Sequence, residues 1–111
     1  MARRLERTGW RILVRNARTA TGELDLIALD GATLVFVEVK AGRLGASAGP
    51  ERPALAVGRR KQLQLRRLAR EWLASADGPR PPWVDGYRFD VVGVSYEGAR
   101  AVEVEHIRNA F

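Results

Sequence analysis

The 111-residue sequence contains no cysteine and only one histidine. The lack of cysteine excludes disulfides, thiolate nucleophiles and cysteine-ligated zinc, and a single histidine cannot form a histidine metal cluster. A bound metal ion would therefore have to be held by carboxylates. No apolar run approaches the ~20 residues that a membrane span needs, and the start MARRLERTGW has no hydrophobic signal segment. We therefore expect a cytoplasmic protein without a membrane partner.

Lysine is also scarce in this sequence. Only two of the 19 Lys and Arg residues are lysine, at Lys40 and Lys61, and the others are arginine. An arginine serves wherever a positive charge is enough, so the two lysines are candidates for roles that need a compact, titratable ammonium. The alternative is that both lysines remain by chance.

The overall composition suits one small globular domain over residues 1–111. Hydrophobic residues make up 46% of the chain and charged residues 29%, which argues against disorder. The formal net charge of +6 suits a polyanionic partner. Nucleic acid is expected before an anionic membrane, because the sequence contains no long basic amphipathic helix with bulky aromatics. The alternative is a soluble basic protein without such a partner.

The apolar patterns and the Gly and Pro positions predict the order helix, three strands, helix, two strands. The expected elements are a helix over 2–8 closed by Gly9, strands over 10–16, 23–29 and 32–40, a helix over about 54–74, and strands over 87–95 and 101–107. A glycine-rich loop is expected over 41–53, and Phe111 is expected to dock on the core. This order predicts an α/β layer protein with a mixed sheet.

The expected helix over 54–74 has one apolar stripe and several basic positions. Leu65, Leu68, Ala69 and Trp72 follow three- and four-residue spacing and should face the core. The other faces carry arginines that we expect to contact a nucleic-acid backbone: Arg59, Arg60, Arg66, Arg67 and Arg70. Lys61 and Gln62 are expected to point at the sheet near the start of the helix. The alternative is that Lys61 extends along the helix to solvent.

The stretch GELDLIALDGATLVFVEVK, residues 22–40, has charged residues in two apolar strands around an Asp-Gly turn signal. Side chains alternate along a strand, so Glu23 and Asp25 share one face, and Glu38 and Lys40 share one face. A two-residue loop at Asp30-Gly31 would set Glu23 opposite Glu38, whereas a four-residue loop would set Asp25 opposite Glu38. Both registers bring all four side chains to one face.

Carboxylates that lie opposite each other on a sheet destabilise it unless their charge is compensated. One lysine balances only one of the three negative charges, so a divalent cation is expected to balance the rest. Oxygen ligands without histidine or cysteine favour Mg²⁺, with Mn²⁺ as its substitute. The alternative is a solvent-facing strand surface with a Glu23 to Lys40 ion pair and no metal. The single histidine, His106, and the three tryptophans are interpreted as structural.

An acidic residue on one strand followed by Glu-x-Lys on the next resembles the PD-(D/E)xK nucleases, here with Asp25 and Glu38-Val39-Lys40. The segments GWRILVRN, GELDLIALDGATLVFVEVK, RKQ, RFDVV and HIRNAF together resemble the YraN family of uncharacterised bacterial proteins, over nearly the whole chain. That resemblance implies a single restriction-endonuclease-like domain related to Holliday-junction resolvases. Its fold would be a central mixed five-stranded sheet flanked by helices.

The resemblance also implies a site. Asp25, Glu38 and Lys40 would be catalytic, and Asp25, Glu38 and the Val39 carbonyl would hold the metal. Supporting positions would be Glu23, Lys61 and Gln62. Family members usually carry a Gly-Glu pair upstream of the residues present here, on the first helix, and in related nucleases a glutamate of that helix helps to hold the metal.

The expected function is therefore Mg²⁺-dependent endonuclease activity, with branched or single-stranded DNA as candidate substrates. The alternatives are a catalytically inactive nucleic-acid-binding module, and an adaptor of a DNA-processing complex that uses Phe111 and the segment RPPW as contact points. Because resolvase-like folds often form dimers, a homodimer is a further expectation by analogy. Proteins of DNA recombination or repair are expected as partners on the same ground.

Overall fold

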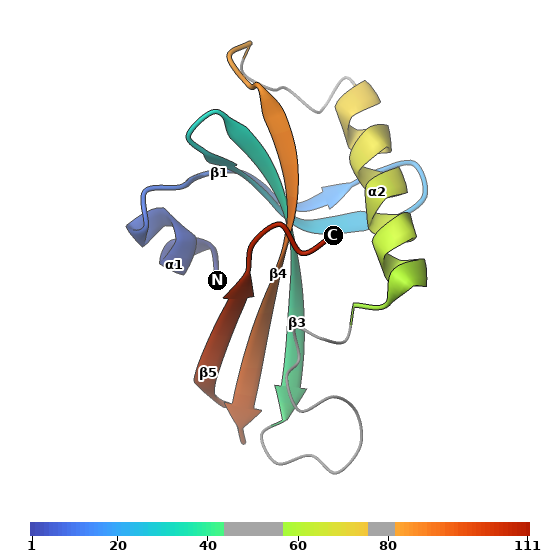
Figure 1. Ribbon diagram of the computed structural model, residues 1–111. Helices are drawn as coiled ribbons and strands as arrows, with labels where there is room; N and C mark the ends of the chain where they lie inside the picture. Colours follow the sequence, from blue (N-terminus) through green and yellow to red (C-terminus); the bar gives the residue numbers. More distant parts are fainter. Residues whose placement is uncertain (44–56, 76–81) are drawn as a thin grey trace.

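The computed structural model describes residues 1–43, 57–75 and 82–111 (Figure 1). Its elements are α1 (Ala2–Arg7), β1 (Arg11–Arg18), β2 (Glu23–Asp30), β3 (Thr33–Arg43), α2 (Arg59–Ala74), β4 (Gly86–Glu97) and β5 (Arg100–Ile107). The strands form one sheet in the order β1-β2-β3-β4-β5, in which only β3 and β4 are parallel. The predicted α/β fold with a mixed five-stranded sheet and flanking helices is confirmed, and it is consistent with a restriction-endonuclease-like fold.

The parallel pairing of β3 and β4 determines where α2 lies. Two parallel neighbours cannot be joined by a tight turn, so the chain crosses from one end of the sheet to the other. The helix α2 is part of this crossover and lies against one face of the sheet, whereas α1 lies on the other side (Figure 1). The sheet is therefore the middle layer of the molecule.

Two apolar cores lie on the two faces of the sheet. Alternation along β3 sends Phe36 into the core beneath α2 and its neighbour Val37 into the core beneath α1. The stripe predicted for α2 is buried as expected: Leu65, Leu68, Ala69 and Trp72. The three- and four-residue spacing of the apolar residues therefore predicts the buried face of α2 correctly.

The hairpin between β2 and β3 has the second of the two predicted registers. Leu26 pairs with Val37 and Asp30 with Thr33, which sets Asp25 beside Glu38. The turn lies at 31–32, one residue later than the predicted Asp-Gly turn. Gly31 adopts a φ of 61°, a left-handed conformation that glycine reaches without strain.

Several element boundaries differ from those predicted, and three of the differences have a clear structural reason. The strand β3 continues to Arg43, because its pairing with β4 extends to Tyr96, so residues 41–43 are not loop. The helix α2 begins at Arg59 rather than near residue 54, since Gly58 has an extended conformation at its N-cap. The helix α1 ends at Arg7 and Thr8 is its C-cap, with Gly9 following at a φ of 94°. The rest of the predicted 41–53 loop and residues 54–56 lie outside the described residues.

A charged network is buried on the α1 face of the sheet. The Asp90 side chain of β4 is fully buried and accepts hydrogen bonds from Arg88, from His106 and from the backbone N–H of Asn109. Trp10 covers this network, with its ring 5.2 Å from the Arg88 guanidinium carbon. The predicted structural role of His106 is therefore consistent with its position, in an edge contact with Trp10.

The C-terminal segment is held by the strand that carries this network. The N–H of Ala110 donates to the Phe89 carbonyl at 2.7 Å, and the Phe111 ring stacks on Phe89 at 5.0 Å. The expectation that Phe111 docks on the core is confirmed. Trp10 and Trp72 are buried, but Trp83 is 57% exposed, so the structural interpretation does not extend to all three tryptophans.

Within the described ranges, no helix is long and apolar enough to cross a membrane.

Candidate active site

Two carboxylates meet where β2 and β3 separate. The backbone pairing of these strands runs only as far as Leu26 and Val37. One residue further on, Oδ2 of Asp25 accepts the N–H of Val39 at 2.8 Å and so takes the place of a backbone partner. The Asp25 side chain also lies beside Glu38 and can share a hydrogen bond with it when one of the two carboxyls is protonated. The predicted pairing of these two acidic residues is therefore present, and the β3 backbone holds one of them in position.

The second carboxylate, Glu38, is in an unfavourable place for a negative charge. Only 9% of the residue is exposed. Burial raises its pKa from 4.5 to about 7, and the hydrogen bond and the negative charge of Asp25 add to that rise. Lys61 and Lys40 oppose it. Near neutral pH Glu38 is thus balanced between its two protonation states, and additional positive charge would favour the carboxylate.

The amine of Lys61 comes to this pair from α2. Its Nζ atom lies 3.9 Å from Oε2 of Glu38, and 35% of its side chain is exposed. Lys61 therefore points toward the sheet, as predicted, rather than along the helix to solvent. The neighbouring Gln62 has a local role, because its side-chain amide donates to the Val57 carbonyl at 3.1 Å, in the segment before α2.

The two remaining predicted residues lie further out on the same strands. Lys40 is partly exposed on β3, two residues beyond Glu38. Its positive charge opposes the rise in the pKa of that carboxyl. Glu23 is exposed at the first residue of β2, where it pairs with Arg18 of β1. The structure therefore brings Asp25, Glu38 and Lys61 together, with Lys40 beside them and Glu23 at the margin.

The donor set suits a hard cation that keeps several exchangeable ligands. In the part of the chain that the structure describes, no three Asp, Glu, His or Cys side chains are grouped closely enough to bind a metal. Asp25, Glu38 and the Val39 carbonyl would supply only oxygen donors. Mg²⁺ is typically held by one or two carboxylates, with water and substrate phosphates completing its octahedron. The pair fits Mg²⁺ or Mn²⁺ of that kind and does not fit a metal enclosed entirely by protein.

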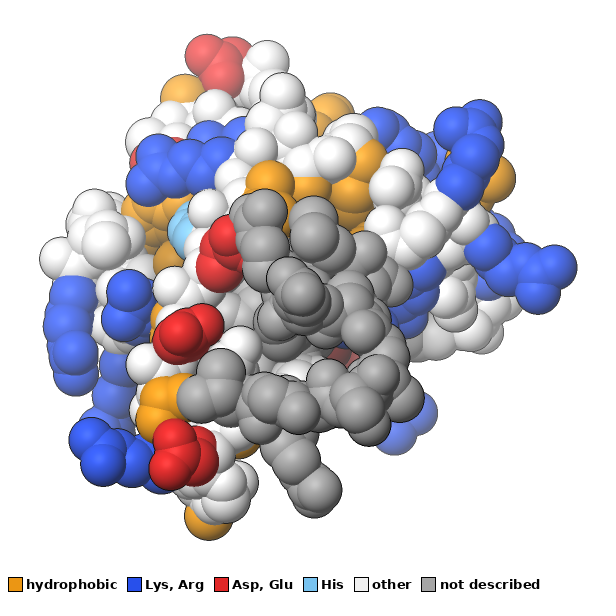
Figure 2. Space-filling view, turned by 60° about the horizontal axis from the view of Figure 1, so that its bottom comes forward, with side chains coloured by type: hydrophobic (Ala, Val, Ile, Leu, Met, Phe, Trp, Pro, Cys, Tyr) orange, Lys and Arg blue, Asp and Glu red, His pale blue; other side chains and the backbone are white. Residues whose placement is uncertain are grey.

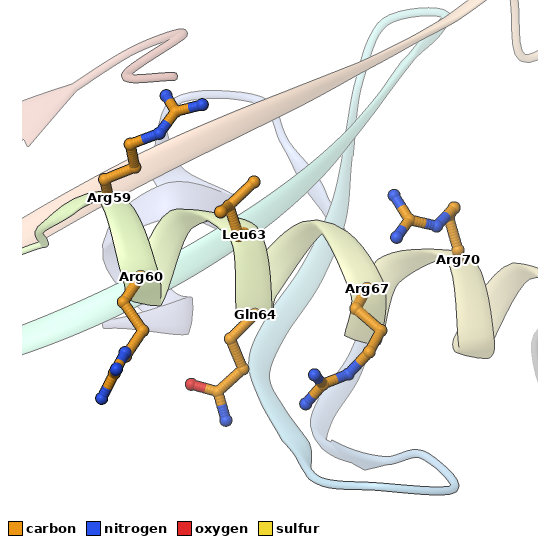
Figure 3. Close-up of a pocket in the computed structure, with 6 residues that line it drawn as sticks. All are labelled: Arg59, Arg60, Leu63, Gln64, Arg67 and Arg70. Carbon is orange, nitrogen blue, oxygen red and sulfur yellow. The ribbon is translucent and has the colours of Figure 1, made fainter.

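Four arginines of α2 are exposed and line one surface of the helix (Figure 3). A groove there is lined by Arg59, Arg60, Leu63, Gln64, Arg67 and Arg70. Arg60, Gln64 and Arg67 point to one side of the helix axis, whereas Arg59, Leu63 and Arg70 point to the other. Four of the five predicted arginines therefore share one surface. The fifth, Arg66, does not line this groove, because its guanidinium lies over the rings of Phe89 and Phe111, at 5.0 and 5.5 Å.

The groove is fixed relative to the sheet by Glu71. This α2 carboxylate accepts the N–H and the hydroxyl of Thr21, in the turn between β1 and β2, at 2.8 to 3.1 Å. Hydrogen bonds from Thr19 and Thr21 lower the pKa of Glu71. Oε2 of Glu71 lies 3.8 Å from Nε of Arg67, one of the groove arginines. The hairpin that carries Asp25 is thus tied to the helix that carries the arginines.

The space-filling view shows how charge is distributed on one face of the molecule (Figure 2). Lys and Arg side chains lie on both flanks of this face, whereas the acidic side chains lie mostly toward its left side. This distribution accords with the net charge of +6. The residues that line the α2 groove include four arginines and no acidic residue, so a polyanion that approaches the groove meets positive side chains.

The fold and these residues define a class: a small basic α/β protein with a carboxylate pair and lysines at a strand junction. A family model described as "Uncharacterised protein family UPF0102" matches residues 1–94. The chain belongs to this family, which is the YraN family that the sequence resembles.

Relatives from several bacteria match almost the full chain. The UPF0102 protein of Parafrankia sp. (strain EAN1pec) is 48% identical over 110 residues, which cover 99% of this chain and 87% of that protein. The UPF0102 protein of Chlorobaculum tepidum is 43% identical over 115 residues, covering 99% and 84%. That of Geobacter sulfurreducens is 44% identical over 108 residues, covering 96% and 78%. Their names state family membership and no activity.

Proposed function

We propose that this protein is a metal-dependent endonuclease that hydrolyses DNA phosphodiesters. The observation that carries the proposal is the contact between Asp25 and Glu38 beside two lysines, in a chain whose other basic residues are all arginine. A purely structural ion pair does not need two adjacent carboxylates, which repel each other. Adjacent carboxylates are instead typical of a centre that binds Mg²⁺ for hydrolysis. Membership of the PD-(D/E)xK superfamily, and a single domain over residues 1–111, are parts of this proposal.

The carboxylate pair would hold Mg²⁺ together with the Val39 carbonyl. When bound there, Mg²⁺ lowers the pKa of water and offsets negative charge on the attacked phosphate. The protein contributes the position of the ligands. The hydrogen bond from the Val39 N–H orients the Asp25 carboxylate, and Lys61 favours the charged form of Glu38.

The two lysines would have different roles at the site. Lys40, on the strand beside Glu38, would orient or deprotonate the attacking water, or neutralise the attacked phosphate. Lys61 is closer to Glu38, so it is a positioning residue for that carboxylate. The Lys40 role cannot be filled equally well by arginine, because a guanidinium stays charged at all relevant pH values and cannot deprotonate water.

The arginine groove of α2 would hold the DNA backbone. Arginines contact phosphates without reading the base sequence, so binding should respond to salt and to the shape of the DNA. The tie between Glu71 and Thr21 keeps this groove at a constant distance from the hairpin that carries Asp25.

The test is cleavage of branched, single-stranded and duplex DNA with Mg²⁺ or Mn²⁺. Wild-type protein should cut at least one of these substrates, and Asp25→Asn and Lys40→Met should each abolish cleavage while DNA binding persists. Glu103→Gln, an exposed acidic position on β5, is the matched control and should retain activity. Binding without cleavage at every metal concentration would replace the nuclease with a nucleic-acid-binding module or an adaptor.

A further inference from the structure

An apolar pocket opens near the C-terminal end of α2, beside the start of β4. It has a volume of about 180 Å³, and its apolar lining comes from Phe36, Ala69, Leu73, Tyr87 and Phe89. The rings of Phe36 and Phe89 stack at 5.4 Å with an angle of 25° between their planes. Tyr87 is 52% exposed. The pocket thus places an exposed tyrosine beside two stacked phenylalanine rings that are themselves buried.

The charged residues that line the pocket, within the described chain, are Arg66 and Arg70. The Arg66 guanidinium carbon lies 5.0 Å from the centre of the Phe89 ring. A cation held over an aromatic face stays in place without a carboxylate partner, so its charge is available to a ligand. The pocket therefore suits a planar, weakly polar group that is attached to an anion.

Arg70 lines this pocket and also the arginine groove of α2. The two features therefore adjoin at Arg70, which Figure 3 shows at one end of the groove residues. From Lys61 to Arg70 the helix rises about 14 Å. At the B-form rise of about 3.4 Å per nucleotide this is about four steps, and an unstacked, extended single strand spans it in fewer. A strand running along the groove from the carboxylate pair would thus reach the pocket within a few nucleotides.

We propose that the pocket receives an unpaired base of a DNA strand whose phosphates lie along the arginine groove. The inference rests on the proposed function and specifies its substrate class as single-stranded DNA or a single-stranded segment. A base within a duplex is stacked and paired, so it cannot enter a pocket unless it is first extruded. An unpaired base can stack on aromatic side chains whatever its sequence.

The experiment measures binding in EDTA, by fluorescence anisotropy, with a labelled single strand and with its duplex. Tyr87→Ala should weaken single-strand binding about tenfold, the scale expected for one lost stacking partner. Tyr87→Phe keeps the ring and should bind within twofold of wild type. Duplex binding should change less than twofold in both variants. Val102→Ala, another exposed apolar position, is the control and should leave both affinities unchanged.

A second variant fills the pocket without removing Tyr87. Leu73→Trp, verified as folded by its thermal melting curve, should also weaken single-strand binding and leave duplex binding unchanged. Wild-type affinity for the single strand in Tyr87→Ala would overturn the proposal, as would an equal loss for single strand and duplex.

The assay separates this proposal from the proposed function, because binding in EDTA does not depend on cleavage. A protein that shows the Tyr87 effect but cuts no DNA contradicts only the nuclease. A protein that cuts DNA and is insensitive to Tyr87 contradicts only the pocket.

Discussion

The Nζ atom of Lys61 lies 3.9 Å from Oε2 of Glu38, which joins α2 to β3 at the carboxylate pair. The ammonium opposes the burial that raises the pKa of Glu38. The same contact links the start of the arginine groove to the candidate metal ligands. Lys61 is therefore central both to the charge state of Glu38 and to the link between α2 and β3.

Replacing Lys61 should change how cleavage depends on pH. In Lys61→Met the pKa of Glu38 rises further, so less of it is ionised at neutral pH. We expect the rate at pH 7 to fall about 10- to 100-fold, as for partners that orient metal ligands. The acidic limb of the pH-rate profile should move to higher pH, and raising the pH should restore part of the activity. Lys61→Arg keeps the charge and should retain most of the profile. A uniform loss at every pH would contradict the positioning role.

Glu38 also makes the stability of the metal-free protein depend on pH. Its pKa is 4.5 when unperturbed and about 7 in the folded state, so the folded protein binds a proton more tightly than the unfolded chain. The resulting stabilisation is complete below pH 4.5 and is lost as the pH rises through 7. The difference corresponds to about 3 kcal/mol at most. Urea denaturation in EDTA between pH 5 and 8.5 should show this decline, and Glu38→Gln should remove it. An identical decline in the variant would assign it to another group.

The carboxylate pair and its lysine could be predicted because strand and helix periodicity are local. Alternation places Asp25 and Glu38 on one sheet face in either register, and the spacing from Leu65 brings Lys61 to the sheet. The exact turn was not predictable, because Gly31 can occupy either of two adjacent turn positions. The start of α2 at Arg59 was not predicted, because the extended conformation of Gly58 leaves no mark in the spacing of the apolar residues.

The Asp90 network was not predicted at all. Arg88 and Asp90 alternate along β4 in a manner typical of a solvent-facing strand surface, and their partners come from distant parts of the chain. One signal was available, because Asp90 interrupts the apolar run FDVVGV. A carboxylate in such a run is buried and must be paired. Its partners are brought to it by the tertiary structure, and the spacing of residues along one strand cannot predict them.

The same network predicts a large stability effect. Burial alone would raise the pKa of Asp90, but hydrogen bonds from Arg88, the Asn109 N–H and His106 outweigh it and lower that pKa. Asp90→Asn leaves the Arg88 charge without its buried partner and should cost about 3–5 kcal/mol of unfolding free energy. Asp85→Asn, at an exposed position directly before β4, should cost less than about 0.5 kcal/mol. Chemical denaturation of both variants at pH 7 measures the difference. Equal stability would show that the network contributes little.

The network should also weaken in acid. Because the folded pKa of Asp90 lies below its ordinary value of 3.8, its contribution is present above that value and is lost as the pH falls through the folded pKa. The stability contribution of Asp90 therefore depends on pH in the opposite direction to that of Glu38. Between pH 4 and pH 2 wild type should lose stability more steeply than Asp90→Asn, and melting temperatures across that range provide the measurement.

The arginine groove predicts a specific salt dependence of duplex DNA binding. The double variant of Arg60→Gln and Arg67→Gln removes two phosphate contacts, so the slope of log affinity against log salt should fall by about 1.8. A matched control is the double variant of Arg3→Gln and Arg7→Gln, which removes two exposed charges from α1. The control should leave the slope nearly unchanged. Equal changes of the slope in both double variants would mean that DNA binding depends only on the net charge of the protein.

The most direct test of the account is whether the carboxylate pair holds a metal ion. Crystals of the protein soaked in Mn²⁺ should show one anomalous peak within about 2.0–2.3 Å of oxygens from both Asp25 and Glu38. The peak should vanish in Glu38→Gln crystals grown and soaked in the same way. Absence of a peak between these side chains at millimolar Mn²⁺, in wild-type crystals whose site is free of lattice contacts, would contradict the metal-dependent centre.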